Sequence, residues 1–242
     1  MGPLHVTQPW HGISHCARSV CSVRIVIDRK IGGGLPIKSL KENEITELNV
    51  PFPLDESQVK QLAGVLKMNT SLKEGIDLSK TNFTRAGATA LGKALCVNKD
   101  LKTIALSSKG GVPTDLDVRD LRGDSKRNAI DLSNRGLKAG DAIVIAELMK
   151  KNKATTKLIL RNNNVKDDGA KALAAMLQKN KTLKKLSLEK NGIGFDGGKA
   201  LRDALLVDNK TLEQLNMYTN NIGTMKQAIT DATSGRKFSI KA

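Results

Sequence analysis

Apolar residues in this chain alternate between two spacings, one typical of strands and one typical of helices. The frame Leu-x-x-Leu-x-Leu, with an Asn three positions later, begins at Leu183 and returns at Leu212. Equivalent frames begin at residues 45, 73, 101, 127, 155, 183 and 212. Only the step from 101 to 127 is shortened. The pattern predicts seven units, each opening with a short strand.

The second part of each unit has helical spacing. Small or apolar residues recur at i, i+3, i+6 and i+7, which places them on one face of a helix. The best sets are Ala88, Leu91, Ala94 and Leu95; Ala142, Ile145, Leu148 and Met149; Ala170, Leu173, Met176 and Leu177; and Gly198, Leu201, Ala204 and Leu205. A helix with a single apolar face needs a neighbour to cover it, so the units are expected to stack around one continuous core.

One unit, residues 101–126, departs from the pattern. Its strand frame is present, but the Gly110-Gly111 pair and Pro113 interrupt any helical register. Residues 109–126 are therefore expected to form an irregular, charged excursion on the convex side. Its four aspartates lack the glycine and terminal glutamate of an EF-hand loop, which favours a solvated loop or docking tab over a calcium site. These aspartates are Asp115, Asp117, Asp120 and Asp124.

The complete unit resembles a known repeat. The strand frame is followed by a glycine near the helix start, then A-L-x-x-x-L, then an N-K-T/D connector. The glycines are Gly87, Gly140, Gly169 and Gly197. This combination is similar to the ribonuclease-inhibitor-like (RI-type) leucine-rich repeat. The resemblance covers residues 45–233 and implies an α/β fold. Its architecture would be a right-handed βα solenoid, or horseshoe, of about seven repeats with parallel strands on the concave face and helices on the convex face.

The flanking segments are expected to differ from the solenoid. Residues 1–44 are interpreted as an N-terminal extension and cap, with a possible strand at 20–27 and a glycine-rich linker at 32–36. The β-branched residues between Val23 and Ile27 favour a strand that covers the edge of the first repeat. Residues 234–242 are interpreted as a basic C-terminal tail.

Composition narrows the class of function. The 242 residues include 40 Lys and Arg against 24 Asp and Glu, a net charge of +16, so a large partner is expected to be acidic. Aromatic residues are only 2%, too few for base-stacking platforms. Three cysteines argue against a disulfide framework and for an intracellular, reducing compartment. The sequence leaves cytoplasmic or cytoskeletal and organellar (mitochondrial) locations open. It has no apolar run of the length needed to span a bilayer.

Catalytic and metal-binding motifs are missing from the repeats. All three histidines, His5, His11 and His15, lie near Cys16 and Cys21 close to the N-terminus, with a spacing that fits zinc poorly. No histidine is left on the solenoid to act as a base. The paired acids Asp167 and Asp168 are better explained as helix-capping residues. The sequence therefore predicts a protein that is not an enzyme and uses no metal, cofactor or small-molecule substrate.

A candidate binding surface follows from strand alternation. In each frame the third, fifth and seventh positions point outward on the concave side. The C-terminal part of this face is basic and includes an arginine and a tyrosine, residue types enriched in binding hot spots. The candidate residues are Lys157, Arg161, Lys185, Glu189, Lys190, Asn216, Tyr218, Asp131 and Asp77. The alternative is a surface that is only solvated.

Lysines also mark the edge where helices turn back into strands. Cations are favoured at helix C-termini by about 0.3–1 kcal/mol each, which explains any single position without a partner. As a stripe of one sign they favour an acidic protein, an RNA backbone or anionic lipid. The stripe includes Lys67 and Lys99, and its candidate contact residues are Lys150, Lys151, Lys153, Lys179, Lys181, Lys184 and Lys210.

Together these features predict a non-catalytic leucine-rich-repeat scaffold or accessory subunit. It would bind proteins with acidic surfaces inside a large assembly. Two alternatives stay open. Ran GTPase-activating proteins use the same repeat type, which suggests a regulator of a small GTPase, although those proteins are acidic at the C-terminus and this chain ends in a basic segment. The other alternative is an RNA-backbone-binding subunit of a ribonucleoprotein particle.

Overall fold

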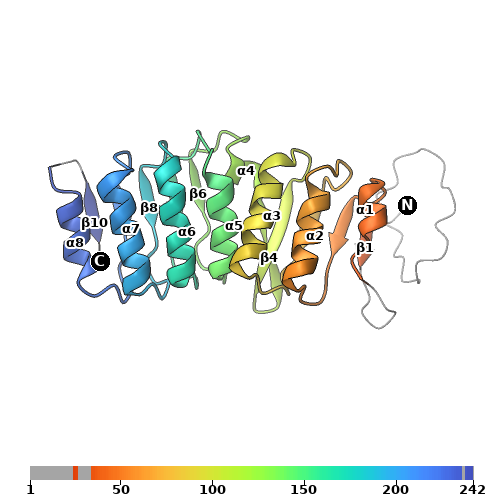
Figure 1. The fold of residues 1–242 in the computed structure, drawn as a ribbon, viewed down its shortest axis with the longest axis horizontal. Helices are drawn as coiled ribbons and strands as arrows, with labels where there is room; N and C mark the ends of the chain where they lie inside the picture. Colours follow the sequence, from red (N-terminus) through yellow and green to blue (C-terminus); the bar gives the residue numbers. More distant parts are fainter. Residues whose placement is uncertain (1–23, 27–33, 236–237, 242) are drawn as a thin grey trace.

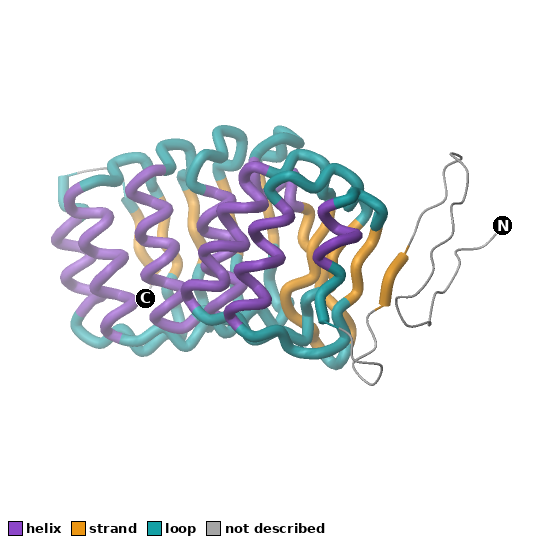
Figure 2. Tube along the Cα trace, turned by 45° about the vertical axis from the view of Figure 1, so that its right-hand side comes forward, coloured by secondary structure: helices purple, strands orange, loops and turns teal. Residues whose placement is uncertain are grey.

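A computed structural model describes residues 24–26, 34–235 and 238–241. Apart from two consecutive strands at residues 103–117, strands and helices alternate along the chain. They lie side by side in sequence order, with the helices in one layer over the strands (Figures 1 and 2). The predicted α/β class with parallel strands is confirmed. The helices are α1 (Ile37–Lys41), α2 (Glu56–Leu66), α3 (Arg85–Val97), α4 (Val118–Arg122), α5 (Ala139–Met149), α6 (Lys166–Lys179), α7 (Phe195–Val207) and α8 (Met225–Ala232).

The strands form two sheets instead of the single row that the repeat pattern predicts. The first sheet has the order β1-β2-β3-β4-β5 and the second has β6-β7-β8-β9-β10. Neighbouring strands are parallel except for β4 and β5. The strands are β1 (Arg24–Val26), β2 (Glu47–Asn49), β3 (Gly75–Asp77), β4 (Thr103–Lys109), β5 (Val112–Asp117), β6 (Ala129–Asp131), β7 (Lys157–Ile159), β8 (Lys185–Ser187), β9 (Gln214–Asn216) and β10 (Ser239–Lys241).

The antiparallel strand β5 corrects the expected irregular excursion at 109–126. Gly110 and Gly111 both have positive φ, 59° and 85°, and form the two-residue turn of a β-hairpin. Pro113 is tolerated because β5 is the edge strand of its sheet, where a missing N–H breaks no ladder. The segment therefore extends the strand layer, and only the short helix α4 follows it. Asp117 caps α4 by accepting hydrogen bonds from the backbone N–H groups of Arg119 (2.8 Å) and Asp120 (3.2 Å).

The predicted helix faces form the core. Every residue of the four apolar sets in α3, α5, α6 and α7 is buried. The apolar strand positions, such as Leu158, Leu186 and Leu215, meet them from the other layer and are also buried. The prediction of one continuous core is confirmed. Among the helices of the described residues, none is both long and apolar enough to cross a bilayer.

Helix α5 is buried on more sides than its pattern predicts, because α4 is too short to separate it from α3. A Cβ on Gly140 would lie 2.6 Å from the Phe83 Cβ, and a Cβ on Gly92 would lie 2.6 Å from the Glu147 Cβ. Both positions therefore need glycine for this close approach. Ile143 and Val144, which lie outside the predicted apolar set, are consequently buried as well.

A row of buried asparagines joins successive units where each helix returns to a strand. Asn180 is typical. Its Nδ2 donates to the carbonyl oxygens of Met149 (2.7 Å) and Asn152 (3.0 Å), and its Oδ1 accepts from the backbone N–H groups of Thr182 and Leu183 (2.8 Å each). We call this row the connector ladder. Its asparagines are Asn69, Asn98, Asn152, Asn180 and Asn209, all at most 3% exposed.

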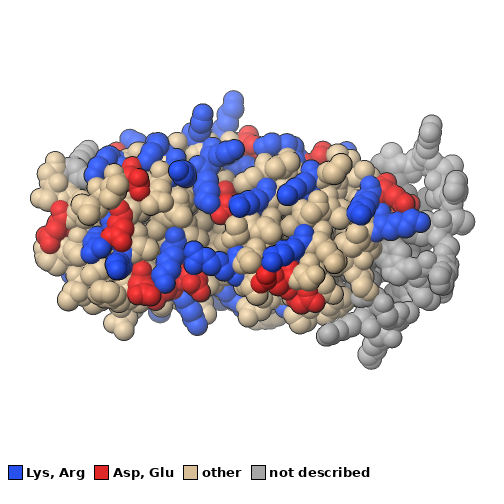
Figure 3. All heavy atoms as spheres, in the orientation of Figure 1, with Lys and Arg blue, Asp and Glu red and all other residues tan. Residues whose placement is uncertain are grey.

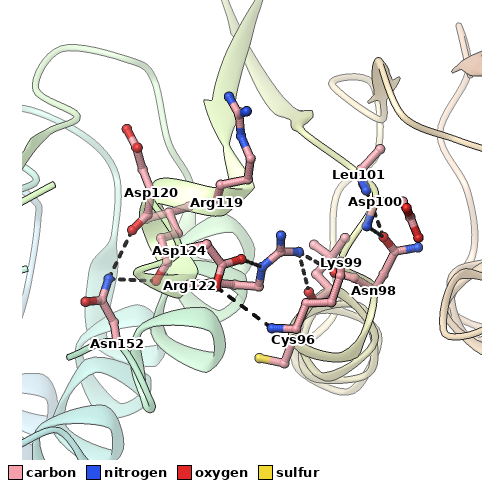
Figure 4. Close-up of polar contacts among 12 residues, drawn as sticks. Cys96, Asn98, Lys99, Asp100, Leu101, Arg119, Asp120, Arg122, Asp124 and Asn152 are labelled. Atoms are coloured by element: carbon pink, nitrogen blue, oxygen red, sulfur yellow. Dashed lines mark hydrogen bonds and ion pairs between the residues drawn. The ribbon is translucent and has the colours of Figure 1, made fainter. Parts of the chain in front are cut away.

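The irregular unit has no asparagine at this place, and Arg122 of α4 substitutes for it. Its Nη1 donates to the carbonyl oxygens of Leu95 (3.1 Å) and Asn98, the same acceptors that an asparagine would bond one unit further on (Figure 4). Its Nε is 2.6 Å from the Asp124 carboxylate. Asn152 continues the ladder by donating to the Asp120 carbonyl at 3.0 Å. The ladder therefore runs unbroken past the hairpin.

A buried carboxylate lies between the hairpin and α5. Asp141 is 1% exposed, and its Oδ2 accepts hydrogen bonds from the Lys138 backbone N–H (2.7 Å) and the Ser107 hydroxyl. Burial raises the pKa of Asp141 above the ordinary aspartate range, although both hydrogen bonds and the Lys138 charge act in the opposite direction. A group with a raised pKa in the folded state destabilises that state as pH rises from the unfolded toward the folded pKa.

We expect Asp141→Asn to gain stability relative to wild type as pH is raised from the acidic range to neutrality, because the amide Oδ1 can accept both hydrogen bonds without carrying a buried charge. Urea unfolding at several pH values measures this difference. Asp131→Asn is the matched control. Hydrogen bonds from Ser133 lower the pKa of the exposed Asp131, so its variant should lose relative stability over the same interval. Equal slopes for the two variants would contradict the prediction.

Both ends of the chain add strands to the sheets. β1 lies inside the range expected for a capping strand and pairs in parallel with β2. Residues 239–241, expected to be part of a basic tail, form β10 and pair in parallel with β9. Helix α8 covers the last unit with Met225 and Ile229. The histidine and cysteine cluster near the N-terminus lies outside the described residues, as does the beginning of the glycine-rich linker at 32–36.

Candidate interaction surface

The outward side of the second sheet gathers most of the predicted contact residues. We call this surface the C-terminal strand face. Its residues are Asp131, Lys157, Arg161, Lys185, Glu189, Lys190, Asn216 and Tyr218. They lie on or just after β6 to β9, where buried leucine, isoleucine and methionine side chains on the same strands fix the outward direction. Asp77 does not join them, because it belongs to β3 of the first sheet, with β4 and β5 in between.

Two lysines lie directly opposite each other at the centre of this face. Lys157 in β7 and Lys185 in β8 are register partners on adjacent parallel strands, and both are exposed. Neighbouring strands are about 4.8 Å apart, and like charges directly opposite one another destabilise a sheet. Among the ion pairs between described residues, none includes Lys157 or Lys185. The charge of Lys157 also acts on the Asp131 carboxylate of β6, but no ion pair among the described residues neutralises the two lysines.

A hydrogen-bonded group lies beside the lysine pair. The Glu189 carboxylate receives the Arg161 guanidinium at one oxygen (Nε to Oε1, 3.1 Å) and the Asn216 amide at the other (Nδ2 to Oε2, 3.0 Å). Both contacts link neighbouring strand ends. Arg161 keeps 58% of its side chain exposed, so its remaining donors face solvent. Glu189 thus orients a cation that can still bind an acceptor from outside.

The turns after the strands carry the remaining residues of the face. The Lys190 backbone N–H donates to the Tyr218 carbonyl oxygen at 2.9 Å, and Lys190 has φ 56°. Asn134, Asn162 and Thr219 have a similar positive φ in other units, so the backbone turns alike in each. The Tyr218 side chain is 60% exposed. Asp131 holds its own turn by accepting from the Ser133 N–H and hydroxyl, which lowers its pKa.

The predicted edge lysines lie at helix ends or in the connections that lead from a helix to the next strand, and four of the seven have partners within the described chain. Lys150 pairs with Glu147 (2.5 Å) and Lys184 with Glu213 (3.1 Å). Lys181 donates to the Asp208 carbonyl (2.6 Å) and Lys210 to the Leu206 carbonyl (2.6 Å). Those two contacts fit the usual preference for cations at helix C-termini. The other three, Lys151, Lys153 and Lys179, are exposed.

Positive charge is concentrated in the second half of the chain. Residues 127–242 contain 22 Lys and Arg against 11 Asp and Glu, while residues 34–126 contain 14 against 12. The boundary coincides with the break between the two sheets. In the view of Figure 3, Lys and Arg also spread along the upper rim, where the helices end. The second half therefore supplies the field that an acidic partner would meet.

Sequence reasoning missed one class of surface residue. Met68, Val97 and Val207 are 84%, 58% and 70% exposed, and all three lie where a helix ends. The helix periodicity marks only buried positions, so it passes over them. They can be recognised by their position in the sequence, because each lies two residues after the last buried residue of its helix.

Neither metal ligands nor histidines gather in the part of the chain that the structure describes. No group of three or more His, Cys, Asp or Glu side chains there is placed to hold a metal ion. The acids of the hairpin unit are used otherwise: Asp117 pairs with Arg119 and Asp124 with Arg122. The absence of a cofactor remains an expectation from the sequence.

Comparison with known proteins agrees with the repeat organisation. A family model described as "Leucine Rich repeat" matches residues 156–174 and 179–201. These segments cover β7 with most of α6, and β8 with the first half of α7. The matched segments are leucine-rich repeats, in agreement with the repeat frame of the sequence and with the strand–helix units of the fold.

The solved structures that resemble the chain include the following two. One, leiomodin-1 actin-binding site 2, is 22% identical, with a TM-score of 0.46 over 52% of this chain and 75% of that chain. The other, the tropomodulin C-terminal domain of Caenorhabditis elegans, is 14% identical, with a TM-score of 0.38 over 72% and 90%. No curated protein sequence matches the chain.

Proposed function

We propose that this protein is a non-catalytic scaffold that binds an acidic protein surface through its C-terminal strand face. In this proposal the units form a right-handed solenoid of about seven repeats with the strand face on its concave side. The partner is a subunit of a large intracellular assembly. The observation that supports this function is the opposed pair Lys157 and Lys185, exposed and without an ion-pair partner among the described residues.

The chemistry of the face indicates what the partner offers. Two adjacent ammonium groups suit a pair of carboxylates, and binding them would relieve the repulsion between the lysines. Arg161 is held by Glu189 and keeps free donors for a third acceptor. Tyr218 adds an exposed aromatic ring at the end of β9, a residue type common at the centre of interfaces.

The first experiment is affinity purification of the full-length chain from the cells that express it, followed by reconstitution with the purified partner. We expect Lys157→Glu/Lys185→Glu to weaken that complex at least roughly hundredfold, because each close charge pair contributes about 1.5 kcal/mol or more. The control, Lys199→Glu/Lys226→Glu, makes the same charge change at exposed positions in α7 and α8.

Three results would contradict the proposal. The control could weaken binding as much as the strand-face variant, which would indicate net charge alone. The partner could lack an acidic surface. Recovery could depend on RNA that ribonuclease removes, which would favour the ribonucleoprotein alternative. A GTP hydrolysis assay with any recovered small GTPase tests the regulator alternative, because a scaffold should not accelerate it.

A further inference from the structure

The helix ends place equivalent side chains in two rows along one edge. The first row is the residue two positions after the last buried residue of the five helices α2, α3, α5, α6 and α7. It consists of Met68, Val97, Lys151, Lys179 and Val207, all exposed. The second row is the residue that follows each asparagine of the connector ladder. It consists of Thr70, Lys99, Lys153, Lys181 and Lys210, all exposed. We call the two rows together the helix-end edge, which lies along the upper rim in Figure 1.

The preference of cations for helix C-termini explains only part of this edge. It accounts for lysines that bond terminal carbonyls, as Lys181 and Lys210 do. It does not account for three large apolar side chains at positions that other units fill with lysine. Leu206, next to Val207, is also 50% exposed. Isolated exposed apolar residues are ordinary, but here they recur at one structural position and flank the lysines at both ends of the row.

The carboxylates near the edge pair with other residues and do not neutralise the central lysines of the edge. Glu147 is paired with Lys150 at 2.5 Å, and Asp124 with Arg122 at 2.6 Å, with Lys99 more distant at 3.9 Å. Within the described chain no ion pair includes Lys151, Lys153 or Lys179. The centre of the edge is therefore cationic. The first row is apolar at both ends, where it lies beside Lys99 at one end and beside Asp208 and Lys210 at the other.

We propose that the helix-end edge docks the protein on an anionic membrane surface. Flexible lysines suit the diffuse negative charge of lipid headgroups. Exposed Met68, Val97 and Val207 would enter the boundary between headgroups and acyl chains, as the apolar side of an interfacial element does. An RNA backbone would use the lysines but gives the aliphatic side chains nothing to contact. The edge shares no residue with the strand face, so this role goes beyond the proposed scaffold function.

The test is cosedimentation of the full-length protein, at moderate ionic strength, with vesicles in which phosphatidylserine makes up roughly a third of a phosphatidylcholine bilayer. We expect binding that is absent with pure phosphatidylcholine. Lys151→Gln/Lys153→Gln/Lys179→Gln should weaken it roughly hundredfold, from about 1 kcal/mol per lysine. Met68→Ser/Val97→Ser/Val207→Ser should weaken it roughly tenfold at unchanged net charge, through loss of buried apolar area.

The matched control is Lys93→Gln/Lys199→Gln/Lys226→Gln, which removes the same charge from exposed helix positions away from the edge. We expect it to bind vesicles within about threefold of wild type, given salt screening at this distance. Equal losses in the control and the edge variant would overturn the proposal, as would failure to bind anionic vesicles. The edge variants could instead weaken binding to a homopolymer RNA or to the purified protein partner, while the wild-type protein fails to bind vesicles. That result would assign the edge to the RNA or to the protein partner.

Separate variants distinguish the proposed protein binding from the proposed membrane binding. Lys157→Gln/Lys185→Gln should release the protein partner and retain vesicle binding. The edge variants should do the reverse. Loss of both activities in either variant would contradict the separation of the two surfaces.

Discussion

Arg122→Met is expected to lower the free energy of unfolding by about 2–4 kcal/mol, because it leaves two buried carbonyl oxygens without a donor. The guanidinium carries the connector ladder across the hairpin unit by bonding the carbonyls of Leu95 and Asn98. Methionine keeps much of the length of the side chain but donates nothing. The Arg122 side chain is only 4% exposed, so water cannot readily replace it. Urea unfolding followed by far-ultraviolet circular dichroism measures the loss.

Arg119→Met provides the control in the same short helix. The Arg119 side chain is 47% exposed and pairs only with Asp117 in the adjoining turn among the described residues. Exposed pairs of this kind contribute about 0–1 kcal/mol, so this variant should remain close to wild type. If both arginine variants lost the same stability, Arg122 would have no special place in the ladder.

Asn180→Ala is expected to lower the free energy of unfolding by about 3–5 kcal/mol, the largest loss among the single substitutions considered. Each buried polar group left unsatisfied costs about 1–3 kcal/mol, and local rearrangement offsets part of the sum over the groups affected. The side chain is 2% exposed and satisfies two carbonyl oxygens of the preceding connection and two backbone N–H groups of its own. Alanine removes all four bonds and opens a small cavity between the units. Urea unfolding measures this loss as well.

Asn164→Ala serves as its comparison. Asn164 is exposed, and its backbone N–H, which donates to the Leu137 carbonyl at 2.7 Å, is unaffected by the substitution. We expect a change within about 0.5 kcal/mol. Equal destabilisation by the two asparagine variants in urea would show that the ladder hydrogen bonds contribute little.

The core of the fold could be predicted because its signals are periodic. Leu158, Leu186 and Leu215 recur at equivalent frame positions, and the helix sets recur with them, so repetition compensates for the weakness of each single signal. The hairpin could not be predicted this way. Leu116 is the only buried residue of β5, which leaves no alternation, and a Gly-Gly pair indicates a broken helix as readily as a turn. Arg122 lies outside any motif because its role depends on where α4 ends.

In the candidate site, too, repetition predicts some features and not others. The frame places Lys157 and Lys185 at one register position, and the structure has them opposite each other. The contact of Glu189 with Arg161 and Asn216 depends on side-chain rotamers, which spacing does not specify. Asp77 joins the others only if the strands form a single sheet, and insertion of β5 separates it from them. The functional roles of all these residues stay predictions.

The seam between β5 and β6 has a mechanical consequence. In a stack where each unit contacts only its neighbours, load passes through every boundary in turn. The strand ladders continue within each sheet, but among the described residues no ladder joins β5 to β6. Arg135 spans this boundary by donating to the Asp115 carbonyl at 2.9 Å, and α3 packs on α5 behind it. When the two ends of the chain are pulled apart, we therefore expect the units to separate first at this boundary, in the middle of the molecule, because no strand ladder holds it together.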